Sequence, residues 1–194
     1  MKKLENYFLY LVVLGGRAEK ANIELHDVRW VVGSKIEDTY DTLRKDWFGS
    51  PEGLHIDSYK KINFVDGYKV NPRNIQNKKI NNNKFHKELN NSKYLWFVNI
   101  GGYDPSSMQE KHEFGLIVAS NQLEAKNTAL SKWLIGCKKK HKDDISKLKS
   151  FTSLDNCQVI NRIGKWQIEL KPVENLVKQN NLPDWLGYKR IDKN

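Results

Sequence analysis

A carboxylate and an imidazole two residues apart occur twice in the chain, as Glu24-x-His26 and Glu110-x-His112. If each pair lies in a strand, both of its side chains point to the same face, because alternate residues of a strand share a face. Carboxylate oxygens and imidazole nitrogens are ligands for divalent metals such as Zn, Mn, Fe and Ni. The two pairs together therefore predict a metal or small-ligand site, with Glu24, His26, Glu110 and His112 as its ligands.

Further residues of suitable chemistry recur with the same spacing. A histidine is followed two positions later by an aspartate at His55-Ile56-Asp57 and again at His141-Lys142-Asp143. Such groups bind a metal directly, or orient a metal-bound histidine by hydrogen bonding. Two glycine pairs, Gly15-Gly16 and Gly101-Gly102, also follow apolar runs, and we interpret them as turns that require a positive φ. The residues expected to bind a ligand or to support the metal ligands are His55, Asp57, His141, Asp143, Gly15, Gly16, Gly101 and Gly102.

These coincidences arise because the chain contains an internal repeat with an offset of 86 residues. The segments 12–47 and 98–133 align without a gap, and the glycine pairs, the Glu-x-His pairs and the final tryptophans of the two segments coincide. A shared register over so many chemically distinct positions indicates a duplication. Two such halves are expected to be related by a pseudo-twofold axis, which would bring the two Glu-x-His pairs together.

Each repeat shows the same order of predicted elements. A short apolar run and an alternating segment predict two strands, at 8–14 and 24–32 in the first repeat. A helix follows, because Ser34 and Glu37 match a capping box and apolar residues recur every three or four positions up to Trp47. Asp66-Gly67 between two apolar segments predicts a hairpin. The repeating unit is therefore strand, strand, helix and hairpin.

This order predicts an α+β fold built from two tandem homologous modules, with antiparallel or mixed sheets and helices on one face. The expected boundaries are 7–70 for the first module, 71–92 for a polar basic linker, 93–172 for the second module and 173–194 for a C-terminal tail. Aromatic residues in that tail, Trp185 and Tyr188, indicate that part of it packs back onto the protein.

The net charge of +10 is concentrated in two places. Residues 71–93 contain six Lys or Arg and a single Glu, and a second basic run spans residues 138–142. Basic segments favour contact with phosphate backbones, so a nucleic-acid-associated binding module is an alternative function. A dedicated nucleic-acid-binding module more often carries its basic residues on a folded face with aromatic residues between them, whereas the first of these segments is predicted to be a linker.

Composition excludes several classes of protein. Aromatic residues make up 11% of the chain and hydrophobic residues 39%, which is enough for a folded core. No apolar run approaches the roughly 20 residues that a membrane helix needs. Two cysteines cannot form a disulfide framework and are typical of a reducing compartment, so we expect a cytoplasmic protein.

The segment 22–34, after the strand end Leu14-Gly15-Gly16, resembles the bacterial family called domain of unknown function 1543. The segments 54–58 and 65–68 are similar to that family too, and the resemblance extends over both repeats. It implies a bacterial, cytoplasmic protein and carries no established activity, so no catalytic residue is transferred from it. The second repeat has Glu113 where the first has Asp27, and Gly115 where it has Arg29, so a site shared by both halves would be asymmetric.

Three functions follow from these patterns. The first is binding of a small ligand or divalent metal at the duplicated Glu-x-His site between the repeats, with metal-assisted chemistry on a small molecule if the protein is an enzyme. The second is the nucleic-acid-associated module. The third is a non-catalytic structural or interaction protein, in which the Glu and His side chains only brace loops.

Overall fold

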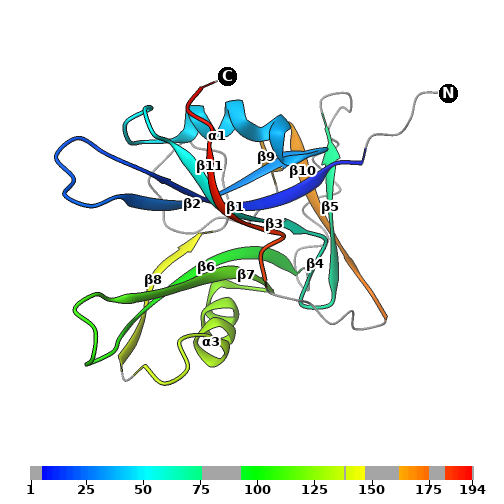
Figure 1. Ribbon diagram of the computed structural model, residues 1–194. Helices are drawn as coiled ribbons and strands as arrows, with labels where there is room; N and C mark the ends of the chain where they lie inside the picture. Colours follow the sequence, from blue (N-terminus) through cyan, green and yellow to red (C-terminus); the bar gives the residue numbers. More distant parts are fainter. Residues whose placement is uncertain (1–5, 76–92, 138, 147–161, 175–181, 194) are drawn as a thin grey trace. The chain divides into compact units, whose positions relative to one another are not determined.

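The computed structural model describes residues 6–75, 93–137, 139–146, 162–174 and 182–193. The chain divides into two compact units (Figure 1). The first contains the strands and helices up to residue 64, residues 70–72 and the strand near the C-terminus, and the second contains residues 65–69 together with the strands and helix between residues 73 and 175. The described part is mostly antiparallel sheet, with two α-helices and one short 3-10 helix.

The first unit is a four-stranded sheet in the order β11-β3-β1-β2. Its central strand β1 (Phe8–Gly16) pairs antiparallel with β2 (Leu25–Gly33) on one side and with β3 (His55–Ile62) on the other. The C-terminal strand β11 (Trp185–Arg190) pairs with the outer edge of β3. A 3-10 helix, η1 (Ile36–Thr39), leads into helix α1 (Tyr40–Asp46) between β2 and β3.

Alternation along β1 decides what each face of this sheet contacts. Tyr10, Val12 and Leu14 are buried in one hydrophobic cluster with Leu43 of α1 and with Trp47, which directly follows that helix. Because successive side chains of a strand point to opposite faces, Gly15 belongs to the face turned away from α1. The helix therefore covers one face, and the predicted site residues beside Gly15 lie on the other.

The second unit repeats this plan in a three-stranded sheet of order β7-β6-β8. Its central strand β6 (Tyr94–Tyr103) pairs antiparallel with β7 (Lys111–Ala119) and β8 (Lys139–Ser146), and helix α3 (Gln122–Lys132) packs on it through Ala125 and Ala129. In both units an acidic side chain accepts hydrogen bonds at the N-terminal end of the helix. In the first unit this residue is Asp38 rather than the predicted Glu37. Asp38 accepts hydrogen bonds from Ser34, and Glu124, at the equivalent position, accepts one from the Ser120 N–H.

Two hairpins form a further sheet in the order β4-β5-β10-β9. The strands are β4 (Phe64–Val65), β5 (Tyr68–Asn74), β9 (Arg162–Ile163) and β10 (Trp166–Pro172). Asp66 and Gly67 connect β4 to β5 with positive φ angles of 46° and 82°, which is the backbone that an Asp-Gly hairpin turn requires. The predicted hairpin is therefore present at this position.

The predicted repeat and its antiparallel strands are confirmed, but the sheet content is higher than the predicted strand-strand-helix-hairpin unit. Each unit has a third long strand after its helix, β3 in the first and β8 in the second.

The interpretation of the glycine pairs as turns was wrong. Gly15 and Gly16 end β1, Gly101 and Gly102 lie within β6, and the described glycines with positive φ are Gly53, Gly67, Gly136 and Gly164.

Candidate functional site

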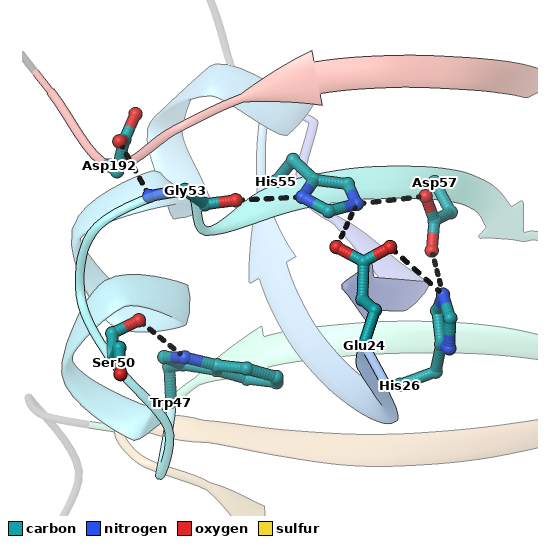
Figure 2. A network of polar contacts seen from close by, with 8 residues as sticks. All are labelled: Glu24, His26, Trp47, Ser50, Gly53, His55, Asp57 and Asp192. Atoms are coloured by element: carbon teal, nitrogen blue, oxygen red, sulfur yellow. Dashed lines mark hydrogen bonds and ion pairs between the residues drawn. The ribbon is translucent and has the colours of Figure 1, made fainter. Parts of the chain in front are cut away.

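Four side chains of the first unit meet in one cluster: Glu24, His26, His55 and Asp57 (Figure 2). His26 Nε2 lies 3.2 Å from Asp57 Oδ2 and 4.0 Å from Glu24 Oε2. His55 Nε2 lies 3.2 Å from Asp57 Oδ1 and 3.4 Å from Glu24 Oε1. Each carboxylate therefore contacts both imidazoles, one with each of its oxygens. We call this group the first-module cluster.

The strand register brings these residues together although they are far apart in sequence. Gly15 of β1 is directly opposite His26 of β2 on one side and His55 of β3 on the other. The pairing of β1 with β3 shifts between Val13 and Leu14, so Asp57 is the extra residue of a β-bulge. Bulges change the direction of a side chain next to functional sites. The bulge thus sets the carboxylate between the two histidines.

The absence of a side chain at Gly15 makes room for this meeting. A Cβ atom at this position would lie 2.4 Å from His55 Nε2 and 3.0 Å from Asp57 Oδ2. Both separations are well below the ordinary contact distance of about 3.5–4.0 Å. Gly16 has the same role on the opposite face, where a Cβ would lie 2.8 Å from the Trp47 ring. The two glycines are therefore required by close packing on the two faces of the sheet.

The protonation of His55 is constrained by its backbone contact. His55 Nδ1 lies 2.8 Å from the carbonyl oxygen of Gly53. Because a carbonyl oxygen only accepts hydrogen bonds, Nδ1 must carry the proton. A neutral ring would then turn the lone pair of Nε2 toward the carboxylates of Glu24 and Asp57. A proton or a metal ion between Nε2 and the carboxylates would satisfy all of these groups.

Burial and ring contacts fix the orientation of this histidine. The side chain of His55 is 1% exposed, whereas that of His26 is 54% exposed and that of Glu24 is 42% exposed. The ring of Tyr188 in β11 lies 4.1 Å from the His55 ring, measured between centroids. The cluster therefore has one immobilised imidazole at its base and an exposed histidine and glutamate at its outer side.

The loop that orients His55 is itself held by the C-terminal segment. The Gly53 N–H donates to Asp192 Oδ2 at 2.9 Å, and the Ile191 N–H donates to the carbonyl oxygen of Leu54. Hydrogen bonds from the Arg190 guanidinium, and then from the Gly53 N–H, hold the pKa of the Asp192 carboxyl well below its usual range. The last strand of the chain thus supports a site formed by its first three strands.

The four side chains of the cluster are of the chemical types that bind cations. In this structure each imidazole contacts the two carboxylates. Imidazole nitrogen and carboxylate oxygen are borderline and hard ligands, respectively, and together they suit first-row divalent metals. Within the described residues, no group of three or more His, Cys, Asp or Glu side chains has its donor atoms placed so that they could hold a metal ion without side-chain movement. The predicted ligands Glu24 and His26 are therefore joined by His55 and Asp57, two residues expected in supporting positions.

The other two predicted ligands form a pair in the second unit. His112 Nε2 lies 3.7 Å from Glu110 Oε2, and His112 Nδ1 lies 3.5 Å from the Asn99 amide nitrogen. The backbones of His141 and Asp143 lie in β8, but their side chains are outside the described part of the structure. A site shared between the two Glu-x-His pairs stays a prediction.

The basic segments proposed for nucleic-acid contact fall largely outside the described residues, which exclude 76–92 and Lys138. Lys140 of the second basic run has a structural role. Its ammonium donates to the carbonyl oxygen of Trp133 at 2.9 Å and to that of Leu130 at 3.4 Å, at the C-terminal end of α3. This is the favourable position for a cation near a helix terminus. The nucleic-acid function stays a prediction.

Sequence reasoning did not identify the supporting residues Gly53, Tyr188 and Asp192. The Gly-Leu-His sequence at 53–55 gives no sign that a carbonyl oxygen will orient an imidazole. Tyr188 lies in β11 and Asp192 two residues after its end, both more than 130 residues away in the chain. The aromatic residues of the tail were the available signal, and the structure confirms that Trp185 and Tyr188 pack back, on Tyr59 and His55.

None of the helices in the described part of the chain combines the length and the apolar character needed to cross a membrane. The fold and the contacts define a protein of two antiparallel-sheet modules, each with a Glu-x-His pair at the strand that follows its central strand. The family model described as Domain of Unknown Function (DUF1543) matches residues 21–71 and 107–160, more than half of the chain. The chain belongs to this family, and the predicted resemblance is confirmed.

A solved structure is similar over nearly the whole chain. The crystal structure of a protein Il1583 from Idiomarina loihiensis is 28% identical in sequence, with a TM-score of 0.65, and the match covers 95% of this chain and 97% of that one. No curated protein matches the chain. The family's description names no activity, so the first-module cluster is the feature of this chain that bears on its function.

Proposed function

We propose that the first module binds a divalent metal ion through Glu24, His26, His55 and Asp57. The observation that supports this most directly is the orientation of His55. Its Nδ1 donates to a backbone carbonyl, and its Nε2 is directed at two carboxylates. A metal-binding histidine commonly has this arrangement, with one ring nitrogen bound to the metal and the other donating to a carbonyl or carboxylate.

The side chains lie at the separations expected around one ion, although one oxygen of each carboxylate would have to turn to reach it. Four ligands at about 2.1 Å from a tetrahedral metal are roughly 3.4 Å from one another. The nitrogen–oxygen contacts in the cluster measure 3.2, 3.2, 3.4 and 4.0 Å, and each carboxylate uses one oxygen for His26 and the other for His55. The longest distance joins Glu24 and His26, the two most exposed side chains, which can rotate toward an ion held by His55 and Asp57.

The charge of the cluster also favours a cation. Two carboxylates lie within 4.0 Å of two imidazoles, so the group carries two negative charges when both histidines are neutral. A divalent ion neutralises this charge without protonating either ring. Zn, Mn, Fe and Ni accept this mixed nitrogen and oxygen ligand set. Once bound, such an ion would act as a Lewis acid on a small molecule that approaches from the exposed side of His26.

The test is a zinc titration of protein purified without a His tag or chelator, with metal content measured by mass spectrometry. Asp57→Asn removes a carboxylate but keeps the side-chain shape, and we expect it to weaken zinc binding by about tenfold or more, because losing even a hydrogen-bonding partner of a metal ligand weakens binding about 10–100-fold. Asp41→Asn is the matched control, because Asp41 is in the same module, 92% exposed and paired with Arg44 outside the cluster.

A wild-type protein that binds neither Zn nor Mn, Fe or Ni would overturn the proposal, and so would an unchanged affinity in Asp57→Asn. Loss of folding stability in Asp57→Asn without any metal binding by the wild type would instead support a bracing role, in which His55 is an imidazolium between two carboxylates.

A further inference from the structure

The strand pairing of the second module matches that of the first module at the positions that correspond to the first-module cluster. Gly101 of β6 is opposite His112 of β7 and opposite His141 of β8. Gly15 of β1 has the same two relations, to His26 and His55. In each module, then, a glycine of the central strand lies between two histidines of the flanking strands.

The β-bulge is repeated as well. In the first module the pairing of the central strand passes from Ser58 to Ile56 and leaves Asp57 without a partner residue. In the second module it passes from Asp144 to Lys142 and leaves out Asp143. Both shifts occur at equivalent places in the central strand, after Val13 and after Asn99. A bulge is a specific backbone feature, so its repetition places Asp143 at the register position of Asp57.

The glutamates complete the correspondence. Glu24 directly precedes β2, which begins at Leu25, and Glu110 directly precedes β7, which begins at Lys111. In both modules the glutamate lies near the histidine two residues further on. The distance from the glutamate Oε2 to the histidine Nε2 is 4.0 Å in the first module and 3.7 Å in the second. All four ligand types of the first cluster therefore have counterparts at equivalent backbone positions.

We infer that the second module has a metal site of its own, formed by Glu110, His112, His141 and Asp143. The chain then binds two divalent cations, one in each module, rather than one cation between the modules. This inference rests on the proposed function of the first-module cluster, because the same ligand set is assigned to both. It follows from the backbone register and from the residue types at the corresponding positions.

The two sites would differ in their surroundings. In the first module β3 is paired on its outer edge with β11, and Tyr188 covers His55. Within the described residues, β8 pairs with β6 alone. The second module also has Asn99, which contacts His112, where the first has Val13. Variants confined to one module should therefore affect one binding event and leave the other unchanged.

The experiment counts zinc ions on the full-length chain by equilibrium dialysis and mass spectrometry, with tag-free protein. His26→Gln with Asp57→Asn removes two ligands from the first site, and His112→Gln with Asp143→Asn removes two from the second. We expect two zinc ions on the wild type, one on each double variant and none on the quadruple variant. Asp41→Asn should retain two. Circular dichroism confirms that each variant is folded.

The alternative outcomes are distinct. One ion, lost only in the first-module variant, would overturn the second site and leave the proposed function intact. One ion, lost in either double variant, would show a single site shared between the modules and overturn the inference. No ion on the wild type would overturn both the inference and the proposed function.

Discussion

Replacing Gly15 with alanine puts a methyl group into the space where the first-module cluster meets. The new Cβ would lie 2.4 Å from His55 Nε2, so the ring would have to move by about 1 Å to reach an ordinary contact distance. The ring is held by its 2.8 Å contact with the Gly53 carbonyl oxygen and by the Tyr188 ring. We expect Gly15→Ala to lower the free energy of unfolding by about 1–3 kcal/mol, the usual cost of overpacking.

Gly16→Ala is the matched control, because it overpacks the same strand on the opposite face. Its Cβ would lie 2.8 Å from the Trp47 ring, so it should also destabilise the protein. Urea unfolding gives the stability of both variants, and a zinc titration gives their metal affinity. Gly15→Ala should lose first-module zinc binding, whereas Gly16→Ala should retain it, since only the first displaces His55.

Two results would refute this reasoning. A Gly15→Ala variant as stable as the wild type would mean that the ring is not confined as the contacts indicate. Equal loss of zinc binding in both glycine variants would mean that metal affinity follows general stability rather than the position of His55.

Two other measurements test the supports of the site and of the second module. The pKa of the Asp192 carboxyl is lower in the folded protein than its ordinary value of 3.8. The contacts of the ionised carboxylate therefore stabilise the folded state at pH values above 3.8, and this stabilisation is lost as the pH falls below 3.8. Asp192→Asn should therefore be less stable than the wild type in urea at pH 7, and the difference should shrink toward pH 2. Lys140→Met removes the ammonium that contacts the carbonyl oxygens ending α3, and it should lower stability by about 0.3–1 kcal/mol in the same assay. An unchanged midpoint for Lys140→Met would show that this contact contributes nothing to the folded state.

The sequence allowed the repeat to be predicted, because apolar periodicity and an ungapped offset are local signals that survive in one sequence. The third strand of each module was missed for a physical reason. Residues 55–62 of β3 include two lysines, a serine and an aspartate, and this strand is defined by its pairing with β1 and β11 rather than by its own apolar pattern. Strand β11 was missed for the same reason, since most of its residues are exposed and its hydrogen-bonding partner is far away in sequence.

The candidate ligands could be listed from sequence, but their grouping could not. Alternation alone placed Glu24 and His26 on one face, and the same rule gave no information on the strand that would lie beside them. His55 and Asp57 join the cluster because β3 pairs with the other edge of β1 and because a bulge occurs at Asp57. The glycines were misinterpreted because a sequence shows where a side chain is missing and does not show whether a turn or a neighbouring side chain uses the space.

These observations give the central glycine a chemical role in the module. In an antiparallel sheet, residues on either side of a central strand are separated by the side chain between them, so two histidines opposite the same residue are normally kept apart. At Gly15 that side chain is absent, and the imidazoles and carboxylates of the two flanking strands can share one space. In the second module, Gly101 of the central strand is likewise opposite a histidine on each flanking strand. A duplicated module that keeps this glycine, the flanking histidines and the bulge retains the backbone needed for the cluster, whichever side chains differ around it.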